Sequence, residues 1–336
     1  MTDTPLSNTR VYPVLQALAE QRVPGARVER LTRLTGGASQ PMWAFELVSP
    51  AGVEALVLRL TGALSGADEG TVGLTEEARL LELMAAHDVP VAGVWQVLDT
   101  HGELGAGYIM QRIEGETLPQ RILRDDAYRA ARQRLARECG QVLAAIHRVP
   151  PADAPYLPRV SVAQWLDRQY REYRSYREPR PVFELAFQWL RDHLPPEPAE
   201  PAIVHGDFRN GNLMVNRHGL RAVLDWEMAH IGDPMADLGW LCVDSWRFGE
   251  IDRPVGGFGS RAQLFAGYEA ASGVSVCAET VGFWEIFGCL KWGIICQKMA
   301  RSFSDGTDRT VERGAIGRRA SETEIDLLAR LAPLAS

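Results

Sequence analysis

The chain has 336 residues, 46% of them hydrophobic, and a formal charge of −7, so it can bury a large core and lacks the basic balance of a nucleic-acid-binding protein. Its five cysteines form no CxxC pair and no Cys/His cluster, which favours reduced thiols and a cytoplasmic protein over a disulfide framework. The first residues lack a basic start and an apolar run, and no stretch approaches a membrane span, so we expect no signal peptide and no membrane partner.

The N-terminal part is rich in strand signals. A short helix is expected over residues 11–22, followed by strands around a Gly-rich turn over 28–60. A second helix is expected over 75–87, with Thr75 as its N-cap. Two further strands are predicted in "VAGVWQVLD" and "GAGYIMQRI".

Helical and strand periodicity each assign one charged residue of this part to a defined face. Helical spacing places Glu77 on one face with three apolar residues, Leu80, Leu81 and Met84. In the strand "EALVLRL", Arg59 takes one face and the leucines take the other.

The sequence becomes helical after Gly115. Helices are expected over 119–148, 161–177 and 181–193, and again from about 260 onward except for a loop at 302–317. These patterns predict an α+β protein with a strand-rich N-terminal lobe at 1–112 and a helical C-terminal lobe at 113–336.

The stretch "VHGDFRNGNLMV", residues 204–215, places polar residues between two apolar ends. Such a pattern predicts a loop braced by two short strands, which is how catalytic groups are often presented. Asp207 and Asn212 lie five residues apart, and Asp225 follows another apolar run. Carboxylate and amide oxygens of this kind suit Mg²⁺.

This set of residues matches the needs of phosphoryl transfer. The reaction needs a carboxylate that orients or deprotonates the attacking hydroxyl, and oxygen ligands for Mg²⁺. Asp207 is predicted to take the first role, and Asn212 and Asp225 the second.

The motifs "HGDFRNGN", "LDWE" and "GDPMADLGWL" together resemble the aminoglycoside phosphotransferase family, over about residues 28–300. Within that family the chain looks most like the branch associated with acyl-CoA dehydrogenases. The resemblance implies a protein-kinase-like fold of two lobes, with a small antiparallel-sheet N-lobe and a large, mostly helical C-lobe.

The resemblance also implies a nucleotide site for ATP or GTP. It assigns to that site Gly36, Gly37, Ser39, Arg59, Glu77, Gln111 and Ile113. The glycines and the serine belong to the phosphate loop "LTGGASQ", and backbone groups from Gln111 to Ile113 would bind adenine. Arg59 stands where the family usually has lysine, with Glu77 as its partner. Arginine and lysine are not freely exchanged, because arginine is a wide planar fork and lysine a point charge.

Arg209 lies two residues after Asp207, where Ser/Thr protein kinases have a lysine that reaches the transferred phosphoryl group. We therefore expect Arg209 to stabilise charge on that group. His205 and Asp237 are expected to support the loop. Glu227 is interpreted as either a metal partner or a surface acid, and Lys291 as part of a core helix over 283–303 or of a pocket.

The predicted function is phosphorylation of a hydroxyl on a small molecule, with ATP or GTP as co-substrate and Mg²⁺ as cofactor. The branch resemblance implies a hydroxyacyl-CoA as acceptor, and an aminoglycoside or sugar is the alternative. From another class, a catalytically inactive nucleotide-binding regulator stays open. The oligomeric state is not predicted.

Overall fold

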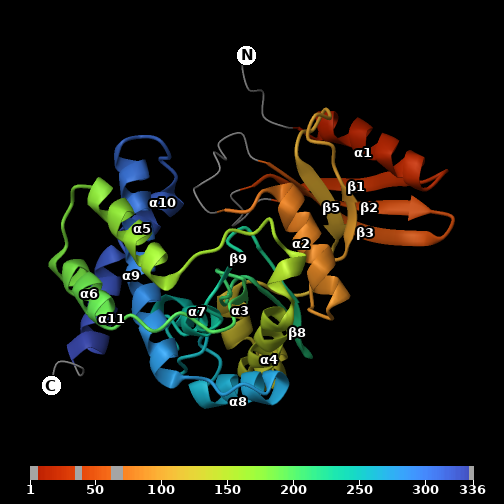
Figure 1. Ribbon diagram of the computed structural model, residues 1–336. Coiled ribbons are helices and arrows are strands. Elements are labelled where there is room, and N and C mark those ends of the chain that lie inside the picture. Colours follow the sequence, from red (N-terminus) through yellow and green to blue (C-terminus); the bar gives the residue numbers. More distant parts are fainter. Residues whose placement is uncertain (1–6, 35–39, 62–70, 333–336) are drawn as a thin grey trace. The chain divides into compact units, whose positions relative to one another are not determined.

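The structure is a computed structural model that describes residues 7–34, 40–61 and 71–332 (Figure 1). Two compact units make up the chain. Unit 1 combines Met1–Gly115 with Arg221–Ala229, and unit 2 combines Glu116–Leu220 with His230–Ser336. The lobe boundary expected between residues 112 and 113 stays a prediction, because a compact unit need not be a domain that folds alone.

Unit 1 is built on a five-stranded antiparallel sheet in the order β1-β2-β3-β5-β4. The strands are β1 (Arg27–Leu34), β2 (Met42–Ser49), β3 (Gly52–Leu60), β4 (Val94–Val97) and β5 (Gly107–Gln111). Side chains alternate along β3, so Leu56, Leu58 and Leu60 pack on one face with helix α1 (Asn8–Arg22). Arg59 lies on the other face, where it meets helix α2 (Leu74–Ala86).

Helix α2 begins one residue earlier than expected. Its N-cap is Gly73, without a side-chain cap, and Thr75 lies inside the helix, so the N-cap prediction for Thr75 was wrong. In place of a side-chain cap, acidic residues in the first turn stabilise the helix by interacting with the positive end of its dipole. The buried face carries Glu77 beside apolar residues, which confirms the inward face predicted from helical spacing.

Unit 2 is mostly helical, so the α+β class predicted from the sequence is confirmed. Its α-helices are α3 (Pro119–Arg124), α4 (Arg129–Arg148), α5 (Val162–Ser175), α6 (Pro181–Asp192), α7 (Met235–Leu241), α8 (Arg261–Ser272), α9 (Ala278–Ser304), α10 (Val311–Gly317) and α11 (Ala320–Leu331). The single helix expected over 119–148 is interrupted, because Asp125 adopts extended backbone with ψ of 135°. Across the described ranges, no helix is long and apolar enough to cross a bilayer.

The polar stretch of unit 2 is held at both ends. Before it, the buried strand β6 (Ala202–Val204) pairs with β9 (His230–Gly232). After it comes β7 (Leu213–Asn216), in which Val215 exchanges two backbone hydrogen bonds with Glu116, at 2.7 and 3.0 Å. Strand β8 (Gly219–Val223) follows. The loop between β6 and β7 is therefore braced by short strands, as the sequence predicts.

Candidate active site

The loop after β6 carries a carboxylate that accepts hydrogen bonds from three side chains. Asp207 Oδ1 accepts from Trp240 Nε1 at 2.7 Å and from Arg209 Nε at 3.0 Å. Its Oδ2 accepts from Asn212 Nδ2 at 2.6 Å. These donors restrict rotation of the carboxylate, so its direction is set before a substrate arrives. The Asp207 side chain is still 19% exposed, which leaves it accessible to a small hydroxyl compound.

Asp237, on α7, fixes the backbone of the same loop. Its carboxylate accepts from the amides of His205 at 2.8 Å and Gly206 at 2.9 Å, and pairs with His147 Nε2 at 3.1 Å. Burial alone would raise the pKa of Asp237, but the hydrogen bond and charge of His147 together with His205 hold it below its usual value. Asp237 is therefore a buried anion whose carboxylate oxygens accept hydrogen bonds from groups of the protein itself. Its expected role as a support of the loop is confirmed.

Trp240 is a member of the site that sequence reasoning missed. It lies three residues after Asp237 on α7, so both side chains reach the same loop from adjacent turns. Its ring also lies 5.2 Å from that of Trp246, and the Arg209 guanidinium lies 4.8 Å from the Trp246 ring. The helical spacing from Asp237 was the available signal, but only the structure shows the indole donating to Asp207.

Arg209 is held by its Nε atom and by the Trp246 ring. Its two Nη groups make no hydrogen bond with the described residues, and the side chain is 26% exposed. This geometry leaves two charged donors beside Asp207 that can meet an incoming anion, as the predicted role of Arg209 requires.

Asn212 is oriented by Asp207. Its Nδ2 donates to the Asp207 backbone oxygen at 3.0 Å as well as to the carboxylate. Since the amide nitrogen is used in this way, the carbonyl oxygen is the atom of the Asn212 side chain that could bind a cation. An amide oxygen is a ligand type that Mg²⁺ accepts, since Mg²⁺ takes few protein ligands and completes its shell with phosphate and water. Asp225, which belongs to unit 1, offers a carboxylate, a ligand type that Mg²⁺ also accepts.

Unit 1 contains a second charged cluster, centred on Arg59. Its Nη1 donates to Glu77 Oε1 at 3.0 Å, its Nη2 to Asp225 Oδ1 at 2.9 Å, and its Nε to Gln40 Oε1 at 2.9 Å. The predicted ion pair with Glu77 is therefore present. Arginine has several donors in a planar fork, so this one side chain binds both acids at once.

Burial and charge oppose each other in this cluster. Burial alone would lower the pKa of Arg59, but the charges of Glu77 and Asp225 hold it above its usual value. Burial raises the pKa of Glu77, and the positive charge of Arg59 opposes that rise. The ionised form of Glu77 thus depends on Arg59.

We expect Arg59→Met to reduce the free energy of unfolding by about 3–5 kcal/mol at neutral pH, because it leaves the buried Glu77 without a cation. Urea unfolding followed by circular dichroism measures the change. The double variant Arg59→Met/Glu77→Gln should recover part of the loss, since the buried charge is removed.

Arg30→Met is the matched control. It removes an arginine that is 77% exposed and paired with Glu46, so its expected effect is below about 1 kcal/mol. Equal stability of the Arg59 and Arg30 variants would contradict a structural role for the buried pair.

Asp225, which follows β8, adopts a left-handed backbone with φ of +65°. This conformation is uncommon for residues other than glycine, although aspartate tolerates it, and such residues often cluster at functional sites. Glu227 borders the same cluster, with Oε2 at 3.8 Å from Arg59 Nη2 and 29% of its side chain exposed. Its position allows a metal-directed role as well as that of a surface acid.

The predicted adenine-binding segment has one available amide. Gln111 N donates to Gly93 O at 2.8 Å, and Arg112 N donates to Ala55 O at 2.9 Å. The amide of Ile113 makes no hydrogen bond with the described residues, so it is the donor of this segment that adenine could use. The predicted phosphate-loop residues Gly36, Gly37 and Ser39 lie outside the described residues.

Solved structures of phosphotransferases share this fold. A candidate aminoglycoside phosphotransferase of Ralstonia eutropha aligns with a TM-score of 0.74 and 26% identity, over 95% of this chain and 97% of that chain. The GDP complex of aminoglycoside 2'-phosphotransferase-IIIa aligns with a TM-score of 0.64 and 16% identity, over 94% and 99% of the two chains, a likeness of fold alone.

Curated relatives are longer proteins. Acyl-CoA dehydrogenase family member 10 of Mus musculus is 30% identical over 185 residues, which are 51% of this chain and 16% of that protein. Acyl-CoA dehydrogenase family member 11 of Gallus gallus is 40% identical over 84 residues, 24% of this chain and 10% of that protein. The chain thus spans a small part of the curated relatives it matches.

The family model agrees with the motifs, the fold and the relatives. Residues 30–274 match the phosphotransferase enzyme family that includes the aminoglycoside phosphotransferases. The acyl-CoA dehydrogenase family members among the relatives also match the branch that the motifs resemble. The protein belongs to the phosphotransferase enzyme family.

Proposed function

We propose that the protein transfers the γ-phosphoryl group of ATP or GTP to a hydroxyl group of a small molecule. The observation that carries this proposal is the Asp207 carboxylate, which three side chains orient while part of it stays accessible. A carboxylate held in this way can align an acceptor hydroxyl and take its proton.

The other polar residues have complementary roles in the proposal. Asn212 and Asp225 would hold Mg²⁺, which when bound neutralises charge on the nucleotide phosphates. Arg59, supported by Glu77, would bind the α- and β-phosphates, and the Nη groups of Arg209 would contact the transferred phosphoryl group. Because the reaction involves little covalent chemistry by the protein, such positioning and charge stabilisation would supply most of the catalysis.

Nucleotide binding has further support from structural neighbours. Those of similar fold include complexes with GDP, with AMP-PNP and with ADP, at 15–17% identity. In this chain the available amide of Ile113 and the phosphate loop that contains Gly36, Gly37 and Ser39 would receive the nucleotide.

For the acceptor, we propose a hydroxyacyl thioester such as a hydroxyacyl-CoA. The support is the match to acyl-CoA dehydrogenase family members, in which the matched region is a small part of a larger protein. An aminoglycoside is the second candidate, because neighbours of the same fold were solved with kanamycin and with hygromycin B.

A coupled ADP-release assay with Mg²⁺ and either ATP or GTP tests the proposal. Its acceptors are hydroxyacyl-CoAs, kanamycin, amino alcohols and sugars, with Asp207→Asn run in parallel. We expect acceptor-dependent ADP release by the wild type only. Thermal stabilisation by ATP and Mg²⁺ without ADP release on any acceptor would instead favour a nucleotide-binding regulator.

A further inference from the structure

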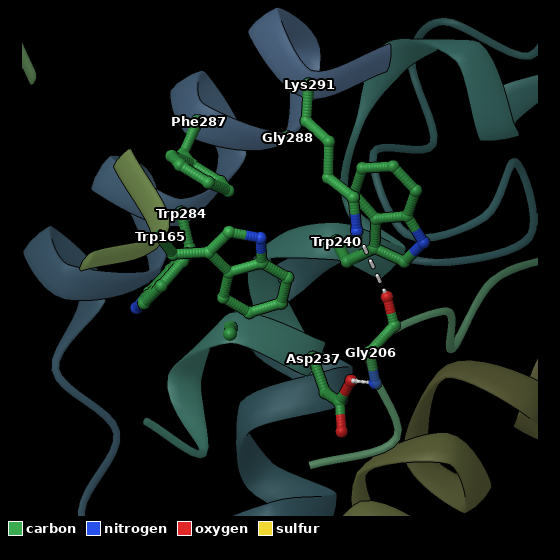
Figure 2. A pocket seen from close by; sticks show the side chains of 9 residues that line it. Trp165, Gly206, Asp237, Trp240, Trp284, Phe287, Gly288 and Lys291 are labelled. Carbon is green, nitrogen blue, oxygen red and sulfur yellow. Dashed lines mark hydrogen bonds between the residues drawn. The ribbon is translucent and has the colours of Figure 1, made fainter. Parts of the chain in front are cut away.

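Lys291 is a buried cation beside the candidate catalytic loop. It lies on α9 and is 6% exposed, and its Nζ is 3.4 Å from Gly206 O. Figure 2 shows the side chain extending from α9 past Trp240 toward this carbonyl group. An ammonium group has three N–H donors, and within the described residues this long hydrogen bond is the one that it makes.

Aromatic rings provide most of its remaining surroundings. Nζ lies 4.5 Å from the ring centroid of Trp240 and 5.0 Å from that of Trp165. The small pocket at this point is also lined by Trp284 and Phe287 (Figure 2). Aromatic faces attract a cation but do not replace hydrogen-bond acceptors.

The acid that lines this pocket is already engaged. Asp237 binds His147 and two backbone amides of the loop, so its carboxylate is not a counterion in contact with Lys291. Burial lowers the pKa of Lys291 to about 8, an effect that the charges of Asp207 and Asp237 partly oppose. A buried ammonium with unused donors gains free energy when an oxygen acceptor reaches it.

Trp240 links this cation to the catalytic carboxylate. Its indole Nε1 donates to Asp207, while its ring lies against the Lys291 ammonium. A molecule whose hydroxyl meets Asp207 could therefore place a second oxygen near Lys291.

We propose that Lys291 determines acceptor specificity by donating a hydrogen bond to a carbonyl or carboxylate oxygen of the acceptor and by disfavouring cationic acceptors. This inference rests on the proposed kinase function and deepens it. It selects acyl or acid acceptors over amino alcohols and aminoglycosides.

A matched set of acceptors tests this role. It consists of 3-hydroxybutyrate, butane-1,3-diol and 4-aminobutan-2-ol, which present an anion, a neutral group and a cation on similar chains, together with 3-hydroxybutyryl-CoA. We expect the wild type to prefer an acceptor with a carboxylate or thioester carbonyl. The preference is measured as kcat/KM for the carboxylate or thioester acceptor divided by kcat/KM for the diol. Lys291→Met should lower this ratio by roughly 10- to 100-fold, mainly by raising KM for the carboxylate or thioester acceptor.

Two further variants separate charge from structure. Lys291→Gln keeps an N–H donor without charge, so it should retain more of the thioester preference than of the carboxylate preference. Lys298→Met is the matched control, because it changes the other lysine of α9, which is exposed, and should leave the ratios unchanged.

An unchanged ratio in Lys291→Met, or a wild-type preference for the amino alcohol, would overturn this role and leave the kinase proposal standing. Failure of the kinase proposal is recognised by the absence of ADP release with every acceptor. In that case the binding of 3-hydroxybutyrate, measured by calorimetry, tests whether Lys291 contacts an oxygen of the acceptor. Binding that weakens in Lys291→Met supports the oxygen contact, and no binding or equal binding refutes it.

Discussion

Replacing Asp207 with asparagine is expected to lower kcat by roughly 10²- to 10⁴-fold, the usual contribution of a positioned general base. Asparagine has nearly the same shape, but its amide cannot accept a proton from the acceptor hydroxyl. It also presents an NH₂ group where Arg209, Asn212 and Trp240 all donate to the carboxylate. Coupled ADP release at saturating acceptor and nucleotide measures the loss.

The asparagine variant must retain its fold and its nucleotide site for this result to be informative. It should still unfold cooperatively, and its affinity for ATP should stay close to that of the wild type, because the nucleotide contacts are assigned to other residues. Asp153→Asn, which neutralises an exposed acid of the same unit, should retain full turnover. If Asp207→Asn turned over at the wild-type rate, Asp207 could not be the base.

Arg209→Ala is expected to reduce kcat by roughly 10²- to 10³-fold, the order found when a donor to a developing charge is removed. The Nη groups of Arg209 are unused within the described residues and lie beside the proposed base. A charge contact made mainly in the transition state affects kcat more than nucleotide affinity. Steady-state kinetics and ATP binding should therefore show a large change in kcat with little change in binding.

Arg209 also donates to Asp207, so lost orientation of the carboxylate is a competing explanation. Trp240→Phe serves as the control, since it removes a different donor to Asp207 and keeps both charges. If Arg209 acts on the phosphoryl group, Arg209→Ala should be much more damaging than Trp240→Phe, and Arg209→Lys should restore part of the rate. Similar losses in the alanine and phenylalanine variants would reduce Arg209 to a positioning role.

Local patterns predicted much of the fold. Helical spacing in α2 correctly placed Glu77 on the inward face, and alternation along "EALVLRL" correctly placed Arg59 on the face opposite the leucines. The structure shows that Arg59 is buried as well and pairs with Glu77. These predictions succeeded because the periods of strand and helix alone decide which side chains share a face. The break at Asp125 was missed, since the surrounding residues favour helix on both sides and only the packed chain selects the extended backbone there.

The candidate site was predictable where its residues are close in sequence. Asp207 and Asn212 are five residues apart in one braced loop, so their contact follows from a local turn. Trp240 and Lys291 reach the same loop from α7 and α9, and although helical spacing places Trp240 on the face of Asp237, the sequence alone does not show that either side chain contacts this loop.

By itself, the sequence determined the chemistry: the spacing of acid, amide and second acid indicated a phosphotransferase, and the apolar flanks indicated a braced loop. Only the tertiary structure decided which donors orient the Asp207 carboxylate, that Arg59 binds Asp225 as well as Glu77, and that a buried ammonium lies beside the loop. The physical reason is that hydrogen bonds and ion pairs depend on distances between side chains, and for residues far apart in the chain those distances are set by how helices and strands pack.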